Sequence, residues 1–236
     1  MLTLRGCPIS RARANWAVDY RPGFVEQIAQ WRAALRAELA ALLPSAASIV
    51  WEIGSGHGHF LARYAAEFPQ CLCVGVDLRN ERLGKSRRKA ERARLPNCHF
   101  VRAEAREFLL ALPTGVAFGE IWALFPDPWP KKRHHKNRLL QPEFFEAVAA
   151  RAGEGTRWYF RTDHGEYFRE VAGFIPGLKT WQLEPDVAWP LEHATVFQDR
   201  AASYHSLVVV RTSHPARPVE TVAPGLPPPT GPKSPA

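Results

Sequence analysis

The amino-acid sequence predicts an α/β fold with a mainly parallel sheet and helices on both of its faces. Strand-like and helix-like segments alternate along the chain, which is the pattern that builds such a sheet. A glycine-rich turn follows the first predicted strand, and acidic residues follow four successive strands. The chain has 236 residues, of which 46% are hydrophobic, and this is enough for one domain with a sizeable core.

The predicted elements follow one another in a regular order. A helix from Val25 to Leu43 carries apolar residues at helical spacing, and Pro44 ends it. Short apolar runs bounded by turn residues predict strands at residues 48–53, 71–77, 99–103, 120–125 and 157–162. Helical patterns follow these strands at residues 60–68, 80–94, 106–112, 142–151 and 165–174. Residues 179–183 and 204–212 are expected to form a closing pair of strands.

Polar residues gather where the predicted strands end. Ligands of open α/β sheets bind at the carboxyl ends of the strands. Asp77 ends the second predicted strand, where a carboxylate can accept hydrogen bonds from both hydroxyls of a ribose. Glu104 and Asp127 follow the third and fourth strands. Together with the glycine-rich turn, these acids predict a site for a cofactor that contains a nucleoside.

The glycine-rich turn reads Glu52-Ile53-Gly54-Ser55-Gly56-His57-Gly58. Its glycines permit positive φ angles and a close approach of a ligand to the backbone. A pyrophosphate would be disfavoured beside the Glu52 carboxylate, and the third glycine comes too early for the dinucleotide pattern Gly-x-Gly-x-x-Gly. A carboxylate suits a cofactor with a cationic amino group and a sulfonium. The turn therefore favours S-adenosylmethionine over NAD.

The most distinctive stretch runs from Phe125 to Lys136 and reads FPDPWPKKRHHK. Asp127 lies between two prolines, which fix their own φ angles and disfavour helix, so we expect it on a stiff, extended turn. Trp129 offers an aromatic face that either stacks on a base or packs under the loop. The cations that follow are expected to contact phosphate groups, and they are Lys131, Lys132, Arg133, Lys136 and Arg138.

The charge and composition bound the partners of the chain. The formal net charge of +8 favours an acidic partner such as nucleic acid. No apolar run reaches the length of a transmembrane helix, and the segment Met1–Arg13 lacks the apolar centre of a signal peptide, so we expect a cytoplasmic protein without a membrane partner. The cysteine and histidine spacings fit no metal site, so no metal is expected. No apolar stripe marks an interface between copies.

The motifs resemble those of the bacterial tRNA (guanine-N7)-methyltransferases. The matching pieces are EIGSG (52–56), GVD (75–77), AEA (103–105), FPDPWPKKRH (125–134), TD (162–163) and TVF (195–197). The resemblance extends from about Ala47 to Arg211 and implies a Rossmann-like class I methyltransferase fold, whose seven-stranded sheet has an antiparallel last strand. It implies methyl transfer from S-adenosylmethionine to N7 of a guanosine in the tRNA variable loop, at tRNA position 46.

We expect the chain to divide into three parts, of which the resemblance covers only the middle one. Residues 1–46 form a basic segment and a helix, residues 47–213 form the methyltransferase domain, and residues 214–236 form a proline-rich tail. The stretch from Pro215 to Ala236 contains eight prolines and almost no large apolar groups. Such a composition cannot bury a core, so we expect the tail to be disordered.

The family match implies roles for single residues. The expected cofactor contacts are Glu52, Gly54, Gly56, Asp77, Glu104 and Asp127. Asp127 also matches the proposed catalytic residue of the family. The expected substrate contacts are Lys131, Asp163, Thr195 and Gln198. The family usually has a glutamate at the last of these positions, and a glutamine carries no charge.

Several alternatives stay open at the level of the sequence. A methyltransferase of the same fold that acts on another RNA or on a small molecule is one, and a non-catalytic tRNA-binding protein, suggested by Gln198, is another. A nicotinamide-dependent dehydrogenase is more distant. Asp163 has the alternative role of a helix N-cap. The cations of the predicted helix 80–94 are interpreted as a solvated face, and Trp31 and Trp51 as core residues.

Overall fold

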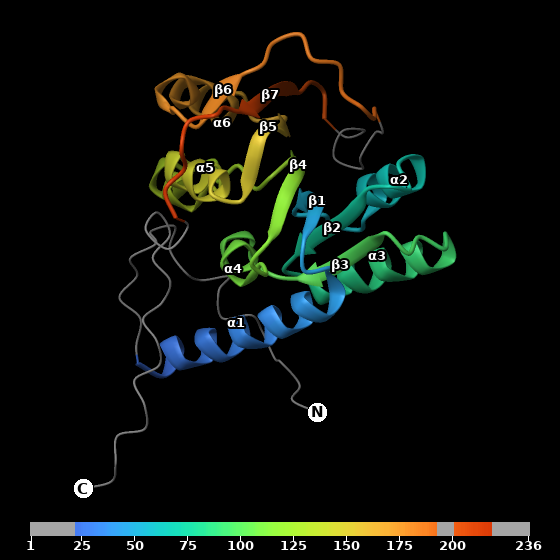
Figure 1. The fold of residues 1–236 in the computed structure, drawn as a ribbon. Helices are drawn as coiled ribbons and strands as arrows, with labels where there is room; N and C mark the ends of the chain where they lie inside the picture. The colour runs from blue at the N-terminus through green and yellow to red at the C-terminus, as the bar shows by residue number, and fades with distance from the viewer. Residues whose placement is uncertain (1–21, 193–200, 219–236) are drawn as a thin grey trace, which may run out of the picture.

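The computed structural model of the chain describes residues 22–192 and 201–218. Six helices and seven strands alternate within them, together with short 3-10 turns (Figure 1). The helices are α1 (Pro22–Leu42), α2 (His59–Glu67), α3 (Asn80–Arg92), α4 (Ala105–Ala111), α5 (Pro142–Ala149) and α6 (Gly165–Phe174). The strands are β1 (Ala47–Ile53), β2 (Leu72–Asp77), β3 (Cys98–Arg102), β4 (Val116–Leu124), β5 (Ala152–Thr162), β6 (Trp181–Leu183) and β7 (His205–Arg211).

The described strands form one seven-stranded sheet in the order β3-β2-β1-β4-β5-β7-β6. The pairs from β3 through β5 are parallel, whereas β7 pairs antiparallel with both β5 and β6. The strand order reverses beside β1, so the carboxyl ends of β1 and β4 diverge there and leave room for a ligand. The fold prediction, including the antiparallel last strand, is confirmed.

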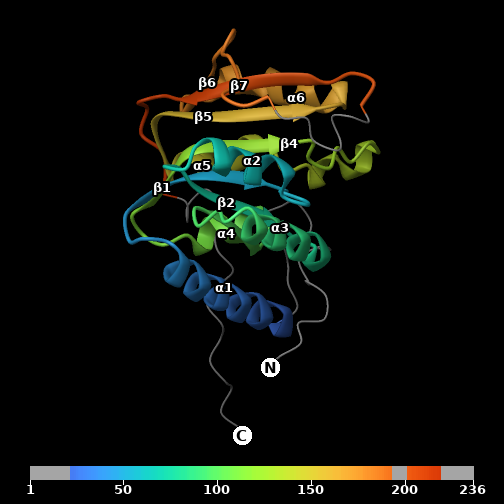
Figure 2. The ribbon, with the colours of Figure 1, turned by 90° about the vertical axis from the view of Figure 1, so that its right-hand side faces the viewer.

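Two apolar layers hold the helices to the sheet. One cluster combines residues of α1, α4, α5 and α6 with one face of the sheet, and Trp51 and Trp158 lie fully buried within it. The other combines α2 and α3 with the opposite face, where Trp122 stacks on Tyr159 with ring centroids 4.0 Å apart. Figure 1 shows α4 and α5 on one side of the sheet and α2 and α3 on the other. Figure 2 shows the strands from the side, with the arrowheads of the parallel strands at one edge.

Two strands and one tryptophan differ from the sequence-based expectation. β4 begins at Val116 rather than near residue 120, and β5 begins at Ala152 rather than near residue 157. Both early halves contain glycines, which weaken the strand signal in a sequence. Trp31 was expected in the core but is only partly buried, because the buried stripe of α1 passes to one side of it. The Arg102 guanidinium lies over its ring. The basic N-terminal segment and most of the proline-rich tail lie outside the described residues.

Candidate active site at the carboxyl edge of the sheet

The turn after β1 is shaped by glycines with two different tasks. Gly54 and Gly56 have φ angles of 73° and 54°, and a Cβ atom at Gly54 would meet no atom within 4 Å. Their backbone therefore borders open space, as a ligand cradle requires. Gly58 begins α2, and a Cβ atom there would lie 2.6 Å from the Phe100 ring. The first two glycines thus open the turn, whereas the third lets α2 pack closely against β3.

Glu52 lies one residue before the end of β1 and carries a buried carboxyl, with 4% of its surface exposed. Burial raises its pKa to about 8; the nearby Asp77 carboxylate acts in the same direction, and a hydrogen bond from the Leu61 backbone and the Lys89 ammonium act against it. Glu52 Oε2 and Ser55 Oγ are buried without a hydrogen-bond partner among the described residues. Unpaired buried polar atoms are costly, so these two groups are suited to meet a polar ligand.

Asp77 braces the glycine turn from the end of β2. One carboxylate oxygen accepts a hydrogen bond from the Gly56 N–H at 3.0 Å, and the other accepts one from the Arg79 N–H at 2.8 Å. Each oxygen keeps a second lone pair, so the carboxylate can also accept from ribose hydroxyls. Asp77 thus lies beside the glycine turn, and its contact with a cofactor stays a prediction.

Glu104 is held in a different way, as the N-cap of α4. Its Oε2 atom accepts hydrogen bonds from the N–H groups of Arg106 and Glu107, at 2.7 and 3.2 Å. Burial raises the pKa of this carboxyl, while the Arg106 cation lowers it. The capping role accounts for much of its hydrogen-bonding capacity. Its contact with a cofactor stays a prediction.

The turn after β4 carries Asp127 in a strained backbone. Phe125 and Trp129 have φ angles of 52° and 45°, in the left-handed region that side chains other than glycine rarely adopt. Such strain persists where the surrounding structure holds it, and it gathers at functional sites. Asp127 is exposed between them and pairs with no described residue. The Trp129 ring meets His134 edge-on at 5.9 Å.

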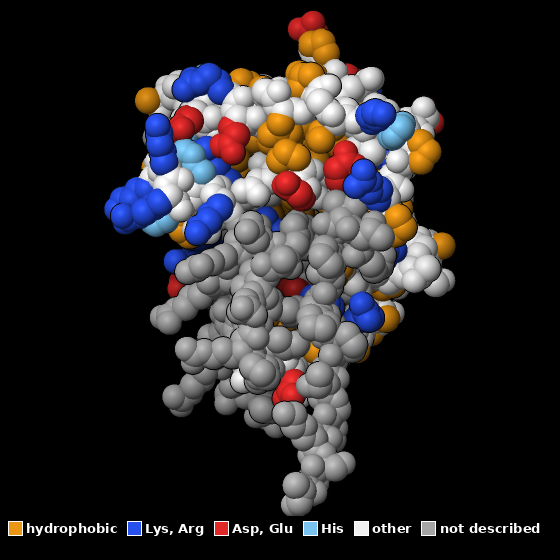
Figure 3. All heavy atoms as spheres, turned by 90° about the vertical axis from the view of Figure 1, so that its left-hand side faces the viewer, with side chains coloured by type: hydrophobic (Ala, Val, Ile, Leu, Met, Phe, Trp, Pro, Cys, Tyr) orange, Lys and Arg blue, Asp and Glu red, His pale blue; other side chains and the backbone are white. Residues whose placement is uncertain are grey.

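The basic run after this turn forms a 3-10 helix, Lys132–Asn137, rather than an α-helix. Lys131, Lys132, Arg133 and Lys136 are exposed, in agreement with a role in contacting phosphates. Figure 3 shows Lys, Arg and His side chains gathered at the edge of the molecule where the strands end. A second group of cations, on α3, is partly used inside the protein: Lys89 donates to the His57 carbonyl and Arg87 to the Phe100 carbonyl.

The prediction that Arg138 contacts phosphate is wrong. Its side chain is 0% exposed, and its Nε donates to the Pro128 carbonyl at 2.8 Å. It pairs with Glu170 of α6, lies 3.0 Å from His135 Nε2 and covers the Tyr167 ring. A guanidinium pairs well with a carboxylate even when buried, because its planar fork satisfies several acceptors. Arg138 therefore fastens the Asp127 turn and the basic 3-10 helix to α6.

Of the remaining predicted substrate contacts, one lies within the described residues and two lie outside them. Asp163 follows β5 and is exposed. It is not the N-cap of α6, because His164 holds that position and its Nδ1 accepts from the Tyr167 N–H at 3.2 Å. The alternative role of Asp163 as a cap is thus excluded. Thr195 and Gln198 lie outside the described residues.

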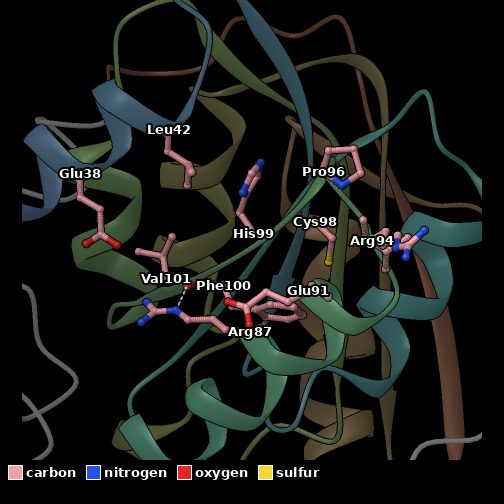
Figure 4. A pocket seen from close by; sticks show the side chains of 12 residues that line it. Glu38, Leu42, Arg87, Glu91, Arg94, Pro96, Cys98, His99, Phe100 and Val101 are labelled. Atoms are coloured by element: carbon pink, nitrogen blue, oxygen red, sulfur yellow. Dashed lines mark hydrogen bonds between the residues drawn. The ribbon is translucent and has the colours of Figure 1, made fainter.

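A groove of the described surface lies away from these residues. It has a volume of about 710 Å³ and opens beside the edge strand β3, between α1 and α3 (Figure 4). Leu42, Arg87, His99 and Val101 are among the side chains that line it. None of the predicted site residues takes part, and the groove is separate from the carboxyl edge where the glycine turn opens.

The part of the chain that the structure describes lacks two further features. No group of three or more His, Cys, Asp and Glu side chains there is arranged to hold a metal ion. None of the helices in those ranges combines the length and the apolar character needed to cross a membrane.

Comparisons with known proteins agree with this geometry. A family described as "Putative methyltransferase" matches residues 46–209. A tRNA (guanine-N(7)-)-methyltransferase of Geobacter metallireducens is 38% identical over 153 residues, which make up 64% of this chain and 72% of that relative. The chain belongs to the tRNA (guanine-N7)-methyltransferase family. A second relative of the same name, from Alkalilimnicola ehrlichii, is 36% identical over 58% of this chain and 56% of its own length.

A solved structure is similar to the chain at a greater distance. It is an rRNA methylase from Streptococcus thermophilus, with 15% identity and a TM-score of 0.49, and the match covers 84% of this chain and 100% of that one. Family membership confirms the resemblance inferred from the motifs, whereas the roles of single residues stay predictions. Sequence reasoning missed the burial of two arginines near the site, Arg138 and Arg161, which are 0% and 5% exposed. Only their place beside the motifs FPDPW and TD hinted at them.

Proposed function

We propose that the protein transfers a methyl group from S-adenosylmethionine to N7 of a guanosine in tRNA, the guanosine of the variable loop. The observation that carries this proposal is one edge of the sheet. There, an open glycine turn with a buried carboxyl lies beside a stiff turn that presents Asp127, followed by exposed cations. Membership of the family supports the same reaction, and residues 47–213 are the proposed catalytic domain.

The residues after β1 and β2 fit the proposed cofactor. The backbone at Gly54 and Gly56 borders open space, and the unpaired Glu52 Oε2 offers an anionic acceptor for a cationic amino group. The Asp77 carboxylate is fixed by two backbone N–H groups at a place suited to ribose hydroxyls. Glu104 and Asp127 complete the proposed set of cofactor contacts. When bound, S-adenosylmethionine supplies an electrophilic methyl group on a sulfonium.

The proposed substrate contacts that the structure describes lie on the other half of the same edge. Lys131 begins the basic 3-10 helix, and Asp163 lies at the exposed end of β5. Thr195 and Gln198 complete the set by their match to the family motif. The exposed cations after Lys131 are suited to bind the phosphate backbone of tRNA, which carries a dense negative charge. A tRNA partner also agrees with the cytoplasmic location expected from the sequence.

The chemistry makes modest demands on the side chains. N7 of guanine has a free lone pair, so no general base is needed to remove a proton. The base becomes cationic as the methyl group is transferred. Asp127 is placed to stabilise that charge, either through the N1–H and N2–H edge of the guanine or through space. The strained turn, held by Arg138, keeps this carboxylate in position and so aligns N7 with the methyl group.

The decisive experiment measures methyl transfer from labelled S-adenosylmethionine to unmodified tRNA, followed by nucleoside mass spectrometry. We expect 7-methylguanosine, and we expect it to disappear when the guanosine of the variable loop is replaced. A product that forms without tRNA would favour the same fold acting on another RNA or on a small molecule. Tight tRNA binding without any product would favour a non-catalytic homologue, and Gln198→Glu would then test whether the missing carboxylate is the reason.

A further inference from the structure

Arg161 near the end of β5 is a buried cation with an unusual number of partners. Its side chain is 5% exposed. The Nε atom donates to Ser206 Oγ at 2.9 Å, and the two terminal nitrogens donate to the Glu192 carboxylate at 3.1 and 3.0 Å. The guanidinium carbon lies 3.9 Å from the centroid of the Trp189 ring and 4.6 Å from that of Tyr204. The cation is therefore paired in its plane and covered on its faces.

These partners come from both ends of one segment. Trp189 and Glu192 belong to the connection that leaves β6, and Tyr204 and Ser206 belong to the stretch where the chain enters β7. Figure 1 shows the described part of the connection reaching from β6 toward the side of the sheet that carries α2. Trp189 packs there against Trp122, with ring centroids 5.4 Å apart. The segment between the two ends contains the family positions 195 and 198.

The same arginine is also joined to the turn of Asp127. The Phe125 N–H donates a hydrogen bond to the Arg161 carbonyl at 2.8 Å. The Phe125 ring meets the Tyr204 ring edge-on, with centroids 6.3 Å apart. Phe125 is one of the two residues of this turn with a positive φ angle, so its backbone depends on such external contacts.

We propose that Arg161 is a positioning residue. It sets the connection between β6 and β7, which contains the predicted substrate contacts 195 and 198, against the Asp127 turn. This inference rests on the proposed function. In this role Arg161 acts through Glu192, Tyr204 and Phe125. By holding the two described ends of that connection and the start of the Asp127 turn, it keeps these three parts of the carboxyl edge at a fixed distance from one another.

A second ion pair on the same strand, which has only a structural role, serves as a comparison for Arg161. Arg157 lies four residues earlier on β5, and its guanidinium binds Glu184 through two hydrogen bonds of 2.7 and 2.9 Å. Both pairs join β5 to the connection after β6. The Arg157 side chain is 45% exposed, however, and it has no contact with the Asp127 turn. Burying a guanidinium is costly, and the exposed pair already fastens this connection without that cost.

The test compares the two arginines by steady-state kinetics with tRNA and S-adenosylmethionine. Arg161→Gln should lower kcat/KM for tRNA by about 10- to 100-fold, through both a higher KM and a lower kcat, because the two segments lose their common anchor. The affinity for S-adenosylmethionine, measured by calorimetry, should change less than about twofold. The matched control Arg157→Gln should keep kcat/KM within about twofold of the wild type.

The partner carboxylate gives an independent variant at a more exposed position. Glu192 is 57% exposed, so Glu192→Gln should fold normally and still lower kcat/KM by about 3- to 10-fold. The double variant of Arg161 and Glu192 should be no more than about twofold worse than Arg161→Gln alone, because the two residues act as one unit. Additive losses would show that they act separately and would overturn the inference.

Hydrogen exchange provides a readout that does not depend on catalysis. In Arg161→Gln, amides of residues 125–129, 187–192 and 201–206 should exchange faster, whereas in Arg157→Gln the 125–129 amides should be unchanged. Unchanged exchange in the first variant, or kcat/KM within twofold of the wild type, would overturn the role of Arg161. A wild-type chain that methylates no tRNA would instead overturn the proposed function, and this inference with it.

Discussion

The two halves of the carboxyl edge hold their polar groups by different means. In the half formed by β1 and β2, the main chain positions the polar groups: glycines open the turn and backbone N–H groups fix Asp77. In the half formed by β4, β5 and β7, buried side chains position them: Arg138 and Arg161 fasten the segments that carry the exposed acids and lysines. A small cofactor is suited to a backbone cradle, whereas a large polyanion needs protruding groups that are braced from behind.

The largest effect is expected from the exposed carboxylate of the second half. Asp127→Asn keeps the shape of the side chain and removes its charge. We expect kcat to fall by about 100- to 1,000-fold, because the positive charge on the base loses its stabilising partner. Filter binding should show tRNA affinity within about threefold of the wild type. Turnover close to normal would mean that alignment by the turn, rather than this charge, drives the reaction.

The side-chain bracing of the second half can be broken at Arg138. Arg138→Met should lower the free energy of unfolding by about 2–3 kcal/mol, because the Pro128 carbonyl and Glu170 lose their partner. Urea unfolding would measure this loss, and methylation should fall with it. Arg133→Met is the matched control, since that arginine is exposed on the same 3-10 helix and should leave stability unchanged. Equal stability of the two variants would contradict the bracing role.

The pH dependence of cofactor binding sharpens the description of the first half. Glu52 has a pKa of about 8 in the folded chain, so it binds a proton there that the unfolded chain has lost above about 4.5. Its contribution to stability is therefore fully present below the lower value and is lost as the pH rises through about 8. A cationic cofactor favours the ionised form, so its affinity should rise across this range, with release of a proton.

Calorimetry in buffers of different ionisation enthalpy measures that proton. In Glu52→Gln, the affinity for S-adenosylmethionine should be about 10- to 100-fold lower at pH 8.5, because a charged hydrogen bond is lost. The steep pH dependence should disappear as well. A wild-type affinity that stays flat between pH 6 and pH 8.5 would exclude Glu52 as the acceptor of the amino group.

The smallest effects are expected from the exposed cations. Lys131→Ala and Arg133→Ala should each weaken tRNA binding by a few fold at low salt. Each should also reduce the slope of log affinity against log salt by about 0.7–0.9, because one fewer phosphate is neutralised. Binding measured at several salt concentrations would show this change. An unchanged slope would remove the residue from the phosphate contacts.

The sequence predicted the first half of the edge better than the second. The glycine turn and the acids after the strands are local patterns, and the structure brings Glu52, Asp77 and the glycines together as expected. Arg138 was expected on the surface, because a basic run in a sequence does not show which of its members is buried. Its partner Glu170 is 32 residues away, and Glu192 is 31 residues from Arg161. Such pairs are set by tertiary structure, which no local pattern records.

The antiparallel direction of β7 has a consequence for the order in which the protein is made. β7 begins opposite Thr162, at the carboxyl edge, so the last strand of the sheet also closes the second half of the site. The glycine turn and its bracing acid are complete once β3 has left the ribosome. The contacts of Arg161 that support the Asp127 turn form only after Tyr204 and Ser206 have been synthesised. During synthesis, which proceeds from the N-terminus, the glycine turn and Asp77 therefore leave the ribosome well before the residues that hold the Asp127 turn.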